Sequence, residues 1–345
     1  MGGRKTILVS ACGSSIGLEV LRSIRMAERD ERVIGMEVSW WGSEVAREYC
    51  DEVIIVPRGD DANYASNLID VIETHSVDLL FLNTEPEIEA IIDVRDSMNI
   101  PVSCCYSDGL SPCLDKKHLH ERLEGLGITA RTKVVENIDD ISIAISDWGP
   151  KVWLRCTKGP RGNGSIIIED TNVAELWINK IAAESEFRYE WMVHEFLPGR
   201  NYNWTSLWKE GELLMASSGE RLEYFMADVS ISGVTGNVSN CRTIDSETIQ
   251  KISIEAVKRS IDMPSGIFSV DLKGNKNDHP IVTEINARQA FRPLLYAKSG
   301  KNFSLAFIDS FLHGLDLGRA ALNEPPIHLE MIRGMDFEPI FRKVR

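Results

Sequence analysis

The sequence predicts an α/β protein that opens with a doubly wound parallel sheet. In the first third of the chain, short apolar runs alternate with longer stretches whose apolar residues recur at helical spacing. The first such stretch places Ile16, Val20 and Ile24 on one face of a helix. This alternation is typical of a parallel sheet with helices on both faces. The expected strands are residues 6–11, 32–36, 52–56, 78–82 and 101–103, and the later helices are expected at 62–75 and 86–98.

Composition and charge describe a globular chain and argue against several classes of partner. The 345 residues are enough for two or three domains, and 43% of them are hydrophobic. The net charge of −14 argues against a nucleic-acid or membrane-surface role, because phosphate groups repel an acidic protein. Seven cysteines occur without a CxxC pair, which favours reduced thiols. No long apolar run and no signal peptide are recognisable, so we expect a cytoplasmic location.

Two loops of this first region could face a ligand. Residues 13–17, Gly-Ser-Ser-Ile-Gly, follow a strand and open a helix, where glycines can cradle a pyrophosphate. Their spacing is not GxGxxG, and a tight bend is the simpler explanation. Residues 83–89 place three glutamates after another strand. These acids either face a substrate or only begin a helix whose dipole favours negative charge.

Two later segments carry cations and glycines in patterns that suit phosphate. Asp115 is a good N-cap for a helix that we expect to end at Gly127, and Lys116 lies in its first turn, where the dipole gives no reason for a cation. Residues 157–165 join two strands through three glycines, with Lys158 and Arg161 between them. Backbone N–H groups and side-chain charge there could wrap phosphate oxygens. A solvated lysine and an ordinary surface turn are the alternatives.

The most informative stretch is a predicted hairpin at residues 266–288. Two alternating strands flank a turn-rich segment, and a register centred on that turn places Asp271 opposite Glu284. Facing side chains in an antiparallel pair have Cβ atoms about 4.5–5.5 Å apart, so the two carboxylates repel each other. Asn286 adds an oxygen on the same face, and Mg²⁺ prefers such oxygen ligands. The alternative is an exposed pair that Lys273 neutralises.

This hairpin resembles the metal-binding signature of the ATP-grasp superfamily. The matching residues are Asp271 and the run Glu284-Ile-Asn-Ala-Arg288, where the usual ending is Glu-hydrophobic-Asn-Pro-Arg. The earlier glycine-rich loop is similar to that family's phosphate-covering loop. Arg155 stands where most members have lysine and the carbamoyl-phosphate synthase-like branch has arginine. The resemblance implies a pre-ATP-grasp, Rossmann-like domain at 1–112, followed by a two-subdomain α+β ATP-grasp fold with subdomains at 113–189 and 190–345.

The resemblance also implies cofactors and a reaction. ATP and Mg²⁺, with Mn²⁺ as a substitute, would serve to activate a small-molecule carboxylate as an acyl phosphate, which an amine then attacks. A carbamoyl-phosphate synthase-like phosphotransferase and a catalytically silent nucleotide-binding protein are the alternatives. We expect neither nucleic acid nor a membrane as a partner, and homodimers are common in the superfamily.

The site residues that the resemblance implies fall into four groups. Core packing is the alternative for Phe196 and Leu197, and a salt bridge to a nearby acid is the alternative for Arg292. The expected phosphate contacts are Lys116, Arg155, Lys158, Gly162, Gly164 and Ser165. The expected adenine contacts are His194, Glu195, Phe196 and Leu197, with Asn201 at the ribose, where an acid is usual. The expected metal ligands are Asp271, Glu284 and Asn286, and the expected catalytic cations are Arg288 and Arg292.

Overall fold

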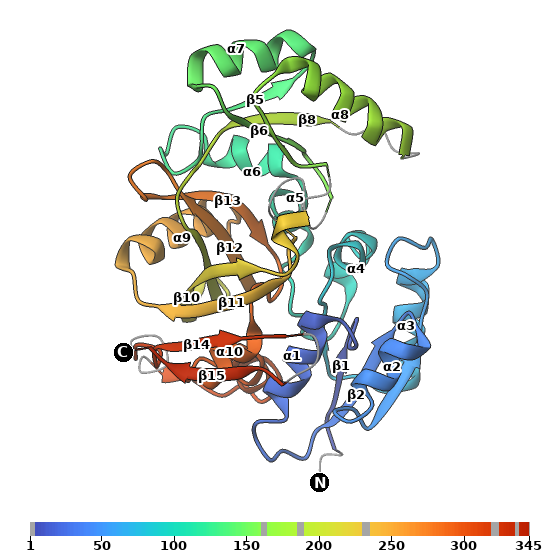
Figure 1. Cartoon of the computed structure of the whole chain (residues 1–345). Coiled ribbons are helices and arrows are strands. Elements are labelled where there is room, and N and C mark those ends of the chain that lie inside the picture. The colour runs from blue at the N-terminus through green and yellow to red at the C-terminus, as the bar shows by residue number, and fades with distance from the viewer. Residues whose placement is uncertain are drawn as a thin grey trace.

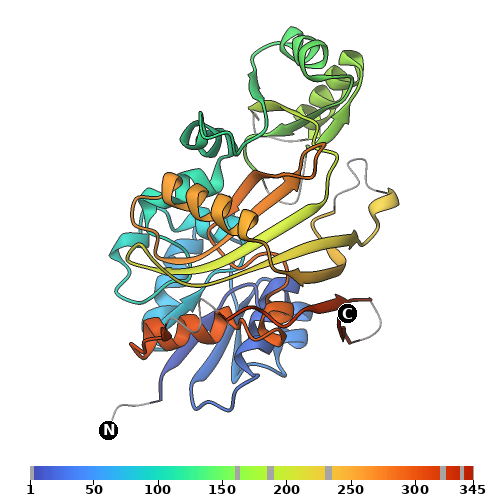
Figure 2. The ribbon, with the colours of Figure 1, turned by 90° about the vertical axis from the view of Figure 1, so that its left-hand side faces the viewer.

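Three sheets, placed one above another in Figure 2, make up the protein. The computed structural model describes residues 4–159, 164–184, 190–229, 235–318, 324–334 and 338–344. All seven cysteines are free. No helix within these ranges is long and apolar enough to cross a membrane.

The N-terminal sheet is parallel, as the sequence predicts. It comprises β1 (Thr6–Val9), β2 (Arg32–Glu37), β3 (Glu52–Ile55) and β4 (Leu79–Phe81), with helices α1 (Ser15–Ile24), α2 (Trp40–Ala46) and α3 (Tyr64–Thr74) between them. The strand order is β3-β2-β1-β4, so the order reverses between β1 and β4. Every residue of these two strands is buried because the sheet is covered on both faces. Ligands bind at the carboxyl ends of strands beside such a reversal.

Three details of this region differ from the sequence expectation. The strand expected at 101–103 is a single bridge between Leu80 and Val102. The helix expected at 86–98 is split into α4 (Glu85–Ala90) and a 3-10 turn η1 (Arg95–Ser97). The break lets the buried Arg95 side chain donate to the carbonyl oxygens of Cys104 and Cys105. Helix α2 was not expected, because its first residues, Trp40 and Trp41, are exposed and give no amphipathic pattern.

A small antiparallel sheet lies at the other end of the molecule (Figure 1). Its strands are β5 (Thr132–Val135), β6 (Val152–Cys156), β7 (Ile166–Ile168) and β8 (Trp191–Glu195), in the order β5-β8-β6-β7. Helices α7 (Ile138–Trp148) and α8 (Thr171–Glu184) pack on one face around a core that includes Ile141, Leu154 and Val193. Helices α5 (Ser107–Leu114) and α6 (Lys116–Leu123) lead into this sheet. Helix α6 ends before Gly127, because Gly125 and Gly127 both have positive φ and turn the chain.

A seven-stranded sheet lies between the other two. Its order is β13-β12-β9-β10-β11-β14-β15. The strands are β9 (Asn201–Lys209), β10 (Glu212–Tyr224), β11 (Val238–Ile244), β12 (Gly266–Gly274), β13 (Pro280–Asn286), β14 (Leu329–Ile332) and β15 (Ile340–Lys343). Helix α9 (Glu247–Ser260) covers one face, and α10 (Pro293–Lys298), α11 (Phe303–Phe307) and the π-helix η3 (Ile308–Leu312) cover the other. Helices α10 and α11 also pack against α1, so they join this sheet to the N-terminal one.

Candidate active site

A cleft of about 1710 Å³ is lined by residues from all three sheets. The N-terminal sheet contributes the loops after β1, β2 and β4, which lie at one edge because parallel strands end together. Strands β6 and β8 contribute from the small sheet, and β10, β12 and β13 from the large one. The residues expected at the site that line this cleft are Lys116, Arg155, Ser165, His194, Glu195, Phe196, Leu197, Asn201, Asp271, Glu284, Asn286, Arg288 and Arg292.

The predicted hairpin register is present in β12 and β13. Asp271 pairs with Glu284, and Ser269 pairs with Asn286. A bulge follows Asp271, after which Leu272 pairs with Val282 instead of Thr283. The Thr283 hydroxyl donates to the Asp271 carbonyl oxygen at 3.0 Å, which holds the two strands together at the bulge. The two carboxylates therefore lie on adjacent strands in the wall of the cleft, with Asn286 on the same strand as Glu284.

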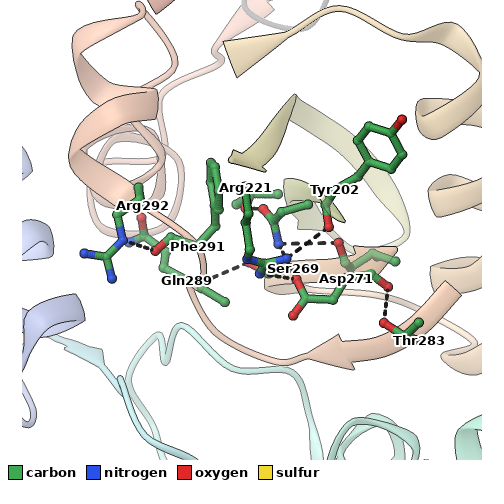
Figure 3. A network of polar contacts seen from close by, with 12 residues as sticks. Tyr202, Arg221, Ser269, Asp271, Thr283, Gln289, Phe291 and Arg292 are labelled. Carbon is green, nitrogen blue, oxygen red and sulfur yellow. Dashed lines mark hydrogen bonds and ion pairs between the residues drawn. The ribbon is translucent and has the colours of Figure 1, made fainter. Parts of the chain in front are cut away.

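Asp271 is neutralised by a residue that the sequence analysis missed. Arg221, on β10, reaches across β9 and donates to Asp271 Oδ1 at 2.6 Å, and Asn203 Nδ2 donates to the same oxygen at 2.8 Å (Figure 3). Burial alone would lower the pKa of Arg221, but Asp271 and, to a smaller extent, Tyr224 and Tyr296 together outweigh burial and raise it. Lys273 instead donates to the Asn201 side-chain oxygen and the Gly199 carbonyl. The alternative in which Lys273 neutralises the pair is therefore wrong.

Glu284 lies among several cations and one further acid. Burial by itself would raise its pKa, but the positive charges around it outweigh burial and lower it. Burial and the neighbouring Glu284 carboxylate raise the pKa of Glu85. Glu85 begins α4, within the glutamate-rich loop at 83–89. The cations that act on Glu284 are Lys116, Arg155, Arg288 and Arg221.

Arg155 is held by neutral partners. Its Nε donates to His194 Nε2 at 3.0 Å, and its Nη2 donates to the Thr283 carbonyl at 2.9 Å. Burial, followed by Arg155, lowers the pKa of His194 well below its ordinary value, so the ring is neutral. Because an arginine N–H only donates, His194 Nε2 accepts, and Nδ1 carries the proton and donates to Thr132 Oγ1 at 2.7 Å. Thr132 in turn donates to the Ala130 carbonyl.

The residues expected to bind phosphate differ in their burial and in their partners. Lys116 is buried apart from 11% of its side chain, and its Nζ lies 3.3 Å from the Gly159 carbonyl and 3.9 Å from Glu284 Oε1. Lys158 lies 3.9 Å from Asp115 and is more than half exposed. Gly164 has φ +77°, and a Cβ there would meet Cys156 Sγ at 2.7 Å, so only glycine fits. Gly162 and Arg161 lie outside the described residues.

The two arginines after β13 have different surroundings. Arg292 is 1% exposed and donates to Glu19 of α1 at 2.8 Å and to the Phe291 carbonyl at 2.7 Å (Figure 3 shows the second contact). The salt bridge left open by the sequence is therefore present. Arg288 donates to the Gln289 carbonyl at 3.3 Å, and its buried Nε has no partner in the described part of the chain. Arg288 acts on both Glu85 and Glu284, so its charge remains directed to the cleft.

The sequence leaves two alternatives open for each of two loops of the N-terminal sheet, at residues 13–17 and 83–89. The Gly13 N–H donates to Glu37, and the Gly17 N–H donates to Ser14 Oγ. These groups already have partners, and the carboxylate of Glu37 disfavours an anion beside Gly13. In the loop at 83–89, Glu87 forms the capping box with Thr84, whereas Glu85 faces Glu284. The helix-cap alternative is thus confirmed for Glu87, whereas Glu85 lines the cleft, where a substrate contact stays a prediction.

Solved structures of carboxylases and ligases resemble this chain over 96% of its length. The biotin carboxylase domain of the 2-oxoglutarate carboxylase from Hydrogenobacter thermophilus, a dimer in complex with MgADP, ADP and bicarbonate, has a TM-score of 0.75 at 12% identity, over 75% of that chain. N5-carboxyaminoimidazole synthetase from Staphylococcus aureus has 0.67 at 14% identity over 84% of its chain. L-amino acid ligase from Bacillus licheniformis has 0.69 at 13% identity over 80% of its chain.

These likenesses establish the fold. The chain has the ATP-grasp fold preceded by a parallel α/β domain, as its motifs predict. No protein-family model and no curated protein matches the sequence. Its activity is therefore argued from the residues of the cleft.

Proposed function

We propose that the chain is an ATP-dependent ligase that activates a carboxylate as an acyl phosphate and joins it to an amine. The observation that carries this proposal is the set of cations around the facing carboxylates Asp271 and Glu284. A phosphoryl group in transfer carries charge on several oxygens, and catalysis of that transfer depends on positioning and charge neutralisation. Within the described residues of the cleft, cations, carboxylates and amides supply these functions.

The donor set fits Mg²⁺. Asp271, Glu284 and Asn286 offer hard oxygen atoms on adjacent strands, and Mg²⁺ is commonly bound by one or two carboxylates together with substrate phosphates. No group of three His, Cys, Asp or Glu side chains forms a self-sufficient metal site within the part of the chain that the structure describes. That arrangement suits a metal that arrives with the nucleotide. Once bound, the ion would neutralise phosphate charge.

The remaining residues suggest how substrates are oriented. Lys116 and Arg155 would hold phosphate oxygens, because their partners leave charge directed to the cleft. His194 to Leu197 form the cleft wall beside β8, where adenine would lie between the two ATP-grasp subdomains. Asn201 lies where the ribose is expected, although its side-chain oxygen already accepts from Lys273.

Arg288 would bind the carboxylate that is phosphorylated. A carboxylate oxygen would attack the γ-phosphorus, and ADP would leave. The amine would then form its bond to the acyl carbon, while phosphate leaves with the electrons of the carbon–oxygen bond and the amine loses a proton. The positive charge of Arg288 would stabilise the negative charge on the carboxylate and acyl-phosphate oxygens in these steps.

Glu284→Gln tests the proposal. We expect ADP release with MgATP and pools of carboxylates and amines to fall by about a hundredfold or more, because several kcal/mol of charge stabilisation depend on this carboxylate. Glu212→Gln, at an exposed position of the same sheet, is the control. Mass spectrometry of the products should show ADP together with an amide. Retention of most Mg-dependent ADP release in Glu284→Gln would refute the metal assignment, and ADP with a stable acyl or carbamoyl phosphate would refute the ligase.

A further inference from the structure

The cleft continues past its charged residues to a second region, which the proposed chemistry leaves unused. The wall there is the carboxyl edge of the N-terminal sheet. Val38, in the connection from β2 into α2, and Trp41, in the first turn of α2, line the cleft although they are 44% and 61% exposed. Exposed apolar side chains in a concave site indicate a ligand surface. Leu222 and Met226, from the end of β10 and the turn after it, also line the cleft and are exposed.

Trp41 is carried by a rigid segment. Both oxygens of Glu37 are used by backbone N–H groups, those of Gly13 and Val38, each at 2.8 Å. Ser39 caps α2 by accepting from the Gly42 N–H. The loop after β1 packs so closely on α2 that a Cβ on Gly13 would lie 2.3 Å from the Gly42 carbonyl oxygen. The backbone beneath Trp41 is thus fixed before any ligand arrives, which lowers the entropic cost of binding.

The strand order gives the distance from this region to the reacting groups. Glu85, which lies in the electrostatic field of Glu284 and Arg288, follows β4. Trp41 follows β2, and β1 lies between these strands. Neighbouring strands are about 4.8 Å apart, so two intervals span about 10 Å along the sheet edge. One substrate of that length would extend along the sheet edge from Trp41 to the side of Glu85, where the charge of Arg288 acts.

The charges near Trp41 favour a neutral group. Arg58 and Asp60 line this part of the cleft and form an ion pair with each other at 3.0 Å. The Glu37 carboxylate is satisfied by the two backbone N–H groups. These charged groups already have partners and offer little to a charged substituent, whereas an aromatic ring can stack on the exposed indole of Trp41.

We propose that this end of the cleft binds an aromatic or heteroaromatic ring of the carboxylic acid substrate, stacked on Trp41, with the reacting carboxylate about 10 Å along the sheet edge, on the side of Glu85 and Arg288. The inference rests on the proposed ligase function and names the substrate class. The substrate is then an arylalkanoic acid, or an acid of similar length that ends in a ring.

Paired acids test this inference. ADP release would be measured with MgATP, the common amino acids as amines, and two series: ω-phenylalkanoates of increasing length and the matching ω-cyclohexylalkanoates. We expect the phenyl acids to be preferred, with an optimum at the length that spans the cleft. Trp41→Ala should abolish the preference and raise the KM for the best phenyl acid about tenfold, with the KM for ATP unchanged. Trp40→Ala is the matched control, because Trp40 is 74% exposed and is not among the cleft residues.

Saturation-transfer NMR of the same acids with MgADP gives a readout independent of turnover. Ring contacts that are present in the wild type and lost in Trp41→Ala support the ring site even if no amide forms, in which case only the ligase proposal fails. Turnover without a ring preference, or an unchanged preference in Trp41→Ala, overturns the inference and leaves the ligase proposal intact. Absence of ring contacts in the wild type also overturns it. If both tryptophan variants change the sedimentation coefficient but not the ring preference, the surface is a contact between copies of the chain.

Discussion

The neutral state of His194 makes a quantitative prediction about acid sensitivity. The ring is buried and accepts a hydrogen bond from Arg155, and its pKa is held well below the ordinary value of 6.5. In the unfolded chain His194 binds a proton near pH 6.5, whereas in the folded chain it does not. The unfolded state therefore binds more protons below that pH, and folding stability falls as pH falls from 6.5 toward the depressed pKa. Above pH 6.5 both states are neutral, and this residue adds no pH dependence.

The size of the effect follows from linkage. Protonation of one unfolded histidine stabilises the unfolded chain by about 1.4 kcal/mol at one pH unit below its pKa, and by less than about 0.1 kcal/mol at one unit above it. Wild type should thus lose about 1.4 kcal/mol from this residue between about pH 7.5 and about pH 5.5. His194→Gln replaces the ring with an amide whose oxygen can accept from Arg155 and which does not titrate. Between the same two pH values, the unfolding free energy of His194→Gln should therefore fall by about 1.4 kcal/mol less than that of wild type.

Urea unfolding followed by tryptophan fluorescence at several pH values measures this difference. The relevant quantity is the change in unfolding free energy with pH, so a constant offset from altered packing does not matter. His279→Gln, at an exposed histidine in the turn before β13, is the control and should keep the wild-type acid sensitivity. Parallel pH profiles for wild type and His194→Gln would show that His194 is protonated in the folded protein, and the hydrogen-bonded chain from Arg155 to Thr132 would then be wrong.

Two further substitutions test the electrostatics of the cleft and of the domain contact. Lys116→Met should raise the KM for ATP by about tenfold to a hundredfold, the range expected for a lost charged hydrogen bond. Lys117→Met is the control, because it removes the neighbouring lysine, which pairs with Glu190, and should leave the KM unchanged. Equal KM values for the two variants would rule out a phosphate contact for Lys116. Glu19→Gln should lower the unfolding free energy by about 3 kcal/mol, because it leaves the Arg292 charge buried without its partner. Glu247→Gln is the control, because it removes only an exposed pair with Lys251 and should not lower the unfolding free energy. Similar urea midpoints for the two variants would contradict the assigned role of the buried pair.

The hairpin shows what local sequence predicts well. Alternation and a turn-rich centre place Asp271 opposite Glu284, and the structure has that register. The electrostatic consequence was predicted less well. Seen alone, the two carboxylates repel each other, but Arg221 pairs with Asp271 and Lys116 lies near Glu284. Arg221 comes from β10, across β9 from Asp271, and nothing in its local sequence indicates that neighbour.

The loop at 83–89 shows the limit of a single-sequence argument in another way. The choice between a helix cap and a substrate-facing acid was posed for the whole loop, but its glutamates have different surroundings in the structure. Glu87 is 4% exposed and caps α4, whereas Glu85 points to Glu284 on another sheet. Capping follows from local spacing, so the sequence carries its signal. A contact between sheets depends on how the domains pack, and local spacing does not encode it.

The same reasoning separates two of the predicted site arginines, Arg155 and Arg292. Arg292 and Glu19 are 273 residues apart in the chain, and Arg155 and Thr283 are 128 apart, so neither partner could be inferred from spacing. The chemistry of the partner decides the role. Glu19 is a carboxylate and neutralises Arg292, which stabilises the packing of α10 on α1. The partners of Arg155 are a neutral imidazole nitrogen and a backbone carbonyl. They orient the guanidinium without cancelling its charge, so Arg155 remains able to bind an anion, as the proposed phosphate contact requires.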